Sequence, residues 1–86
     1  MPTISRFKGI QVRMYYFEHP PPHFHIRYSG IEAAVEILSG KVLEGTLPVR
    51  IERLIKKWTR QNRRALDRNW ILAKWNKPLL AVSPLE

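Results

Sequence analysis

The spacing of the apolar residues changes near residue 45, and this change constrains the fold more than any other feature of the sequence. Before it, β-branched and aromatic residues alternate with polar ones between turn signals, a pattern that predicts strands. After it, apolar residues recur every three or four positions, which predicts helix to about Asn76. We therefore expect an α+β fold in which a small antiparallel sheet of four or five strands packs against one long or two shorter helices. The chain would be one domain, β-rich in residues 1–45, helical in 46–77, with 78–86 as a tail or a short edge strand.

Turn signals divide the first half into short strands. Lys8-Gly9, Ser29-Gly30 and Ser39-Gly40 are typical turn pairs. The three prolines at 20–22 have no N–H to donate to a ladder, so they force an extended connection before the next strand. The strands expected from this pattern are Ile4–Phe7, Ile10–Phe17, His23–Tyr28, a strand after Ser29-Gly30, and Lys41–Glu44.

The register of the central hairpin follows from its turn. A two-residue turn at Ser29-Gly30 pairs residues whose numbers sum to 59, as 29 and 30 do. One face of this hairpin is then wholly apolar, with the pairs Phe24–Val35, Ile26–Ala33 and Tyr28–Ile31. The other face has the pairs His23–Glu36, His25–Ala34 and Arg27–Glu32. Such a separation of apolar and polar faces supports the register.

The helical half has recognisable boundaries. Gly45-Thr46-Leu47-Pro48 predicts a helix start, since proline is well tolerated in the first turn and Thr46 or a near neighbour would cap it. Polar residues from Thr59 to Arg64 interrupt the apolar stripe and predict a kink or a break. Pro78 ends the helix. Trp58 and Trp70 fall on the apolar stripe, so we expect them in the core.

Length and composition exclude several classes of protein. A chain of 86 residues has room for one modest core, and the absence of cysteine excludes disulfides, thiolate metal sites and a cysteine nucleophile. No apolar run approaches the roughly 20 residues that span a bilayer, and the first residues do not resemble a signal peptide. We therefore expect a cytoplasmic protein that does not enter the membrane.

The positive charge lies almost entirely in the helical half. Residues 49–77 hold ten bases and two acids, which equals the net charge of +8 for the whole chain. Six of these bases follow steps of three or four and would form one stripe along a helix: Arg50, Arg53, Lys57, Arg60, Arg64 and Arg68. A stripe with so few acids would bind the phosphates of RNA or DNA, or an acidic protein. The simpler interpretation is a solvated face opposite the core.

The segment His19-Pro20-Pro21-Pro22-His23-Phe24-His25 is the strongest chemical signal. His23, His25 and Arg27 project from one strand face because strand side chains alternate. The two imidazoles would bind a transition metal, with His19 or Glu36 as a third ligand. They would alternatively act as general acid and base in RNA cleavage, with Arg27 holding a phosphate and Glu36 orienting His23. The plainest interpretation is architectural: partly exposed histidines beside a rigid turn.

Four motifs carry a family resemblance: Met1-Pro2-Thr3-Ile4-Ser5-Arg6-Phe7 with Gly9-Ile10, the segment His19–His25, Val42-Leu43-Glu44-Gly45 with Leu47-Pro48, and Asn69-Trp70. With these motifs, the chain resembles the small bacterial proteins catalogued as domain of unknown function 4160. The resemblance implies a short bacterial protein, often encoded beside another small protein in an arrangement similar to toxin–antitoxin pairs. It implies no established activity. The helix of this chain departs from the family pattern, which is more acidic, at Lys56-Lys57 and Arg63-Arg64.

These observations support three functional hypotheses. The first is a nucleic-acid-associated component of a toxin–antitoxin-like pair, which binds RNA or DNA through the basic stripe. If it is an enzyme, a metal-independent ribonuclease using His23, His25, Arg27 and Glu36 is the first expectation. The second is a non-enzymatic module that docks an acidic cognate protein. The third is a His-x-His metal-binding protein with His19, His23 and His25 as candidate ligands, although no cofactor is required by the sequence.

Overall fold

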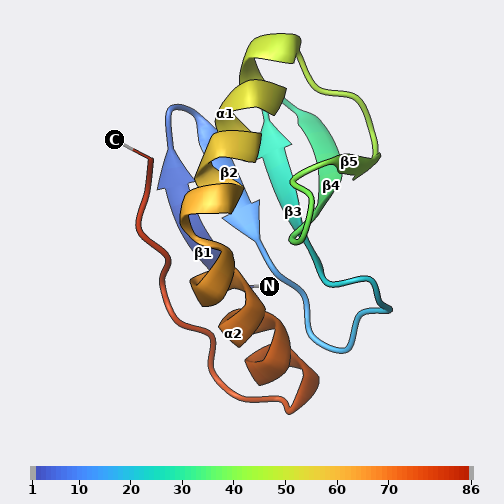
Figure 1. Ribbon diagram of the computed structural model, residues 1–86, viewed down its shortest axis with the longest axis vertical. Helices are drawn as coiled ribbons and strands as arrows, with labels where there is room; N and C mark the ends of the chain where they lie inside the picture. Colours follow the sequence, from blue (N-terminus) through green and yellow to red (C-terminus); the bar gives the residue numbers. More distant parts are fainter. Residues whose placement is uncertain (1, 86) are drawn as a thin grey trace.

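The computed structural model describes residues 2–85 and shows an antiparallel sheet followed by two helices (Figure 1). The five strands lie in the sheet in chain order, so each pairs with its neighbour in sequence. This confirms the predicted α+β fold, and of the four or five strands expected the sheet has five. The strands are β1 (Thr3–Phe7), β2 (Ile10–Arg13), β3 (His23–Tyr28), β4 (Ile31–Glu36) and β5 (Val42–Glu44).

The β3–β4 hairpin has the register derived from its turn. His23 pairs with Glu36, and the ladder continues to the pair of Tyr28 and Ile31. Phe24, Ile26 and Val35 are buried on one face. The inward face of β2 continues this surface, because Ile10 and Val12 are buried as well. The alternation in the sequence therefore identified the core face of the sheet.

The second strand is shorter than predicted, and the prediction of a strand from Ile10 to Phe17 was wrong at its end. β2 stops at Arg13, which pairs with Thr3 of β1 and with His25 of β3. Beyond Arg13, β1 offers no further strand residue, and the segment before β3 consists of prolines without N–H donors. The chain therefore leaves the sheet and forms a connecting segment, residues 14–22.

α1 lies over one face of the sheet, and α2 continues past the ends of the strands (Figure 1). α1 (Val49–Gln61) and α2 (Arg63–Lys74) are separated at Asn62, within the interval where the apolar stripe is interrupted. The side-chain amide of Asn62 donates to the carbonyl of Trp58, 3.0 Å away, which occupies a carbonyl at the end of α1. Pro48 occupies the position before α1 and no side chain caps it, so the expected cap by Thr46 is not present.

Trp58 lies at the centre of the core between sheet and helix. It is fully buried, packs edge-on against Phe24 at 5.6 Å between ring centroids, and contacts Phe7 at 5.2 Å. Its indole N–H donates to the carbonyl of Ser83, 2.8 Å away. Trp70 is only half buried, so it lies at the edge of the core rather than inside it.

The C-terminal tail runs back along the sheet edge formed by β1 (Figure 1). It is not a strand: one backbone hydrogen bond, from Val82 to Ile4 at 2.8 Å, joins it to β1. The buried amide of Asn69 holds it by donating to the carbonyl of Leu80 and accepting from its N–H, at 2.8 and 2.9 Å. Both polar ends of this buried amide are thereby satisfied.

A search of the described residues for membrane spans finds no helix with the length and apolar character to cross a bilayer.

Gly45 allows the chain to pass close to β4 after β5, and this gives a test of the fold. It has φ +84°, and a Cβ there would lie 2.5 Å from the carbonyl oxygen of Glu32. We expect Gly45→Ala to lower the free energy of unfolding by about 3 kcal/mol, the sum of left-handed strain and a backbone clash. Urea denaturation measures this change.

Gly30 provides the matched control. Its φ of +79° is similar, but a Cβ there would meet nothing within 4 Å. Gly30→Ala should therefore cost only the conformational strain, about 1 kcal/mol. An equal decrease in the free energy of unfolding for the two variants would contradict the close approach of Gly45 to β4.

Candidate functional site

The connecting segment 14–22 returns a carboxylate to the outer face of the sheet. Phe17 has φ +59°, a left-handed conformation that is uncommon for an aromatic residue, and its side chain is 69% exposed. The residue after this turn is Glu18, which is only partly exposed and contacts β3. The backbone reversal at Phe17 thus precedes the residue that completes the site.

Glu18 contacts both histidines of β3. Its Oε1 lies 2.5 Å from Nε2 of His25, and its Oε2 lies 3.4 Å from Nε2 of His23. The side chains of Glu18 and His25 are each 25% exposed and that of His23 is 12% exposed. Two imidazoles and one carboxylate therefore share a partly desolvated position at the end of the sheet.

The orientation of His23 is set by its surroundings. Its Nδ1 lies 2.8 Å from the carbonyl oxygen of Pro21. A carbonyl can only accept, so Nδ1 carries a proton in this contact, and Nε2 is the ring nitrogen that faces Glu18. The ring also packs against Trp70 of α2, with centroids 5.3 Å apart. His25 is held in a similar way by Tyr15, at 4.4 Å.

The three groups have the spacing of metal ligands. One ligating atom each from Glu18, His23 and His25 can be chosen so that all three lie within 4.8 Å of one another. Ligands bound to Zn²⁺ at about 2.1 Å in tetrahedral geometry lie roughly 3.4 Å apart. The contact of Glu18 with His23 already has this length, 3.4 Å, and the contact with His25 is shorter. Small side-chain movements would therefore bring all three atoms to ligand distances.

A cavity of about 220 Å³ opens beside these three side chains. Its walls come from the connecting segment, β3, β4 and β5. The residues that line it are Glu18, His19, Pro20, Pro21, His23, His25, Ala34, Leu43 and Glu44.

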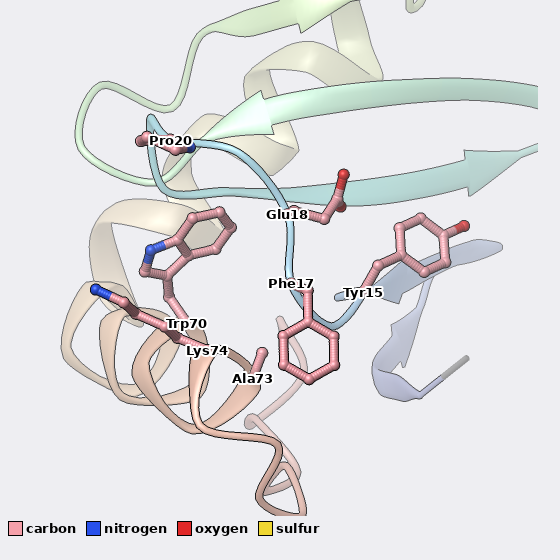
Figure 2. A pocket seen from close by; sticks show the side chains of 7 residues that line it. All are labelled: Tyr15, Phe17, Glu18, Pro20, Trp70, Ala73 and Lys74. Carbon is pink, nitrogen blue, oxygen red and sulfur yellow. The ribbon is translucent and has the colours of Figure 1, made fainter.

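A second hollow of about 150 Å³ lies on the other side of Glu18 and is mainly apolar (Figure 2). Figure 2 shows Trp70 projecting from α2 toward the connecting segment that carries Glu18 and Pro20, whereas the side chain of Lys74 extends away from Phe17 and Glu18. Glu18 and Pro20 line both hollows. The connecting segment therefore forms the wall between them.

The structure separates the residues that the sequence analysis grouped as one site. His23 and His25 lie together. Glu36 is opposite His23 in the register, but its carboxylate accepts a hydrogen bond from the hydroxyl of Ser39 in the following turn. Arg27 forms an exposed ion pair with Glu32, with 3.3 Å between nitrogen and oxygen.

His19 and the basic residues have more open positions. His19 is exposed and lines the 220 Å³ cavity, but it is not part of the three-residue cluster. The break at Asn62 divides the stripe between the two helices. All six of its side chains are exposed: Arg50, Arg53, Lys57 and Arg60 on α1, and Arg64 and Arg68 on α2.

Glu18 is a site residue that was not predicted from the sequence. The predicted strand extended to Phe17, so the chain was not expected to reverse there and the direction of Glu18 could not be assigned. The sequence did indicate Glu18 in one way, because it directly precedes His19, the first residue of the histidine segment. A β-strand that must stop before three prolines has to turn, and a carboxylate in such a turn is a candidate ligand.

A comparison with known families matches residues 9–71 to the family described as "Domain of unknown function (DUF4160)". The chain belongs to this family. The matched range contains the residues that line the 220 Å³ cavity, among them Glu18, His23, His25 and Glu44. Searches of curated proteins and of solved structures find no significant match.

The protonation of His23 provides a test of the site geometry. We expect its proton on Nδ1, because that atom faces the carbonyl of Pro21. Long-range proton–nitrogen NMR distinguishes the two tautomers. Glu18→Gln should shift the Nε2 signals of both histidines, whereas Glu36→Gln should leave them in place because Glu36 is bound to Ser39. Equal shifts in the two variants would contradict the placement of Glu18.

Proposed function

We propose that this protein binds a divalent transition metal through Glu18, His23 and His25. The observation that carries the proposal is the convergence of three ligating atoms within 4.8 Å. Two imidazoles and one carboxylate form the ligand set of several zinc enzymes and of non-haem iron sites. The absence of sulfur ligands favours zinc, iron, nickel or copper held by nitrogen and oxygen.

The surroundings of His23 support a metal centre over a simple hydrogen-bonded cluster. Metal-bound histidines commonly donate the distal ring N–H to a backbone carbonyl, which fixes the ring and directs the other nitrogen at the metal. His23 has this arrangement with Pro21. A metal bound to Nε2 of His25 would replace the proton that now lies between that atom and Glu18.

The same contacts bear on the ribonuclease hypothesis. A metal-independent ribonuclease needs a cation beside its two histidines to stabilise the phosphate. Arg27, the residue proposed for that role, pairs with Glu32, and the charged group in contact with both imidazoles is the carboxylate of Glu18. An anion between the histidines repels phosphate and attracts a metal ion. We therefore favour the metal.

A second function, association with RNA or DNA, is supported by the exposed basic stripe. The three ion pairs found within residues 2–85 involve Glu18 and Arg27, so no stripe residue is paired with a described carboxylate. Six exposed cations on two consecutive helices, none of them paired with a described carboxylate, suit a polyanion. In this proposal the protein is a cytoplasmic bacterial component of a toxin–antitoxin-like pair, and an acidic cognate protein is the alternative occupant of the stripe.

Metal content tests the first proposal. We expect the purified protein, after dialysis against excess Zn²⁺ and removal of free metal, to retain one zinc ion per chain by elemental analysis. Glu18→Gln, His23→Ala and His25→Ala each remove one ligand, so the affinity measured by calorimetry should fall at least about 100-fold.

His19→Ala is the matched control. It removes an imidazole from the same cavity without removing a member of the cluster, so zinc content should be unchanged. Wild-type protein without zinc, or the same affinity in the three ligand variants, would rule out the centre.

Salt dependence tests the second proposal. If the stripe contacts phosphates, the affinity for labelled duplex DNA or RNA should fall steeply with salt, with a log–log slope of about −5 for six contacts. A double variant, Arg60→Gln with Arg64→Gln, should lower the slope by about two units because each cation neutralises one phosphate.

Arg6→Gln, an exposed base on the sheet, is the control and should leave the slope unchanged. Binding that is absent at low salt, or indifferent to the double variant, would contradict the proposal. Capture of the neighbouring gene product, lost in the double variant, would favour the acidic protein partner instead.

A further inference from the structure

The cavity beside the proposed metal centre contains one more carboxylate, Glu44. The ladder pairs His25 with Ala34 across β3 and β4, and Ala34 with Glu44 across β4 and β5. These three residues therefore form one row on the same face of the sheet. His25 and Glu44 stand at the ends of the row, and all three residues line the cavity.

The small residue in the middle leaves room between the ends of the row. Neighbouring strands are separated by roughly 4.8 Å, so the Cα atoms of His25 and Glu44 are about two such steps apart. The imidazole of His25 and the carboxylate of Glu44 both belong to residues that line the cavity, and the residue between them in the row contributes only a methyl group. This span accommodates a metal ion on His25, a water molecule on the metal, and a carboxylate oxygen beyond it.

The backbone holds Glu44 in this position. The next residue is Gly45, whose close approach to Glu32 and Ala33 of β4 ties the end of β5 to the sheet. The side chain of Glu44 makes no hydrogen bond or ion pair with any of the residues 2–85. β4 carries two further carboxylates on this face. Glu36 accepts a hydrogen bond from Ser39, and Glu32 accepts one from Arg27. Glu44 is therefore the free carboxylate in the cavity.

Three protein ligands leave a coordination position open on a zinc-like ion, as in catalytic rather than structural sites. Resting on the proposed metal centre, we propose that the site is hydrolytic: a water molecule on the metal is deprotonated by Glu44 and attacks the carbonyl carbon of an ester or amide. The ligand set of two histidines and a glutamate, with a further glutamate as base, serves this chemistry in zinc peptidases.

The step balances without another reactant. Glu44 takes one proton from the metal-bound water, and the hydroxide forms a bond to the carbonyl carbon while the carbonyl oxygen gains the electron pair. Collapse of this intermediate breaks the bond to the leaving group, which receives the proton from Glu44. The products are a carboxylic acid and an alcohol or amine.

The charges that line the cavity favour an uncharged acyl substrate. The two positive charges of the metal are balanced by Glu18 and Glu44, and His19 is the remaining ionisable residue of the wall. A phosphodiester would place its negative charge against Glu44 and be repelled, whereas a neutral carbonyl group is not repelled by that carboxylate. The reacting group assigned to this cavity is therefore an ester or an amide.

Hydrolysis of 4-nitrophenyl acetate by the zinc-loaded protein tests the inference. We expect saturable hydrolysis above the rates of free Zn²⁺ and of the chelator-treated protein. Glu44→Gln should lower kcat/KM at least about 100-fold, the usual contribution of a general base, with zinc stoichiometry unchanged. Ala34→Leu, which fills the space between His25 and Glu44, should lower the rate while zinc is retained.

Glu32→Gln is the matched control, because Glu32 is an exposed carboxylate on the same sheet face outside the cavity, and it should keep the full rate. Protein that binds no zinc would overturn the metal centre itself. Zinc-loaded protein with no activity, or with activity unchanged in Glu44→Gln, would overturn the hydrolytic role alone. Turnover of bis(4-nitrophenyl) phosphate that depends on Glu44, without ester hydrolysis, would overturn the acyl assignment.

Discussion

Side chains along β3 alternate between the two faces of the sheet, and both the core and the candidate site depend on this alternation. Phe24 and Ile26 are buried beneath α1, where Phe24 meets Trp58 edge to face. His23 and His25 point the other way and meet Glu18. A shift of the β3 register by one residue would place imidazoles in the core and Phe24 in the cavity, so the packing that stabilises the fold also positions the site.

Prolines 20–22 belong to the connecting segment that completes the site. β2 ends at Arg13 opposite His25, and the chain between β2 and β3 leaves the sheet before it reaches the prolines, which have no N–H to donate to a ladder. The reversal at Phe17 then returns Glu18 to the histidines, and the carbonyl of Pro21 orients His23. The proline run therefore has an architectural role, as its composition suggests, and it also supplies a contact typical of metal centres.

The two chemical features of the molecule differ in character. The site is a partly buried cluster beside a cavity whose lining includes two glutamates and neither lysine nor arginine among the residues that the structure describes. The basic stripe is exposed on α1, which lies over the opposite face of the sheet, and on α2, whose Trp70 packs against His23; none of the six stripe residues lines the cavity (Figure 1). A small reactant at one and a polyanion or acidic protein at the other would not compete for the same surface. The range matched to DUF4160, residues 9–71, contains both the site residues and all six stripe residues.

Local pattern was enough to determine much of this protein. The change of apolar spacing determined the order of sheet and helices, the turn at Ser29-Gly30 determined the register of β3 and β4, and that register placed His23 and His25 on one face. These properties depend on neighbours in sequence, whose geometry is periodic. The end of β2, the burial of Trp70, the diversion of Glu36 to Ser39 and the approach of Glu18 and Glu44 to the histidines were decided only by the tertiary structure. Each depends on where a non-repetitive segment leads the chain and on which partner it meets there, and side-chain periodicity carries no information about either.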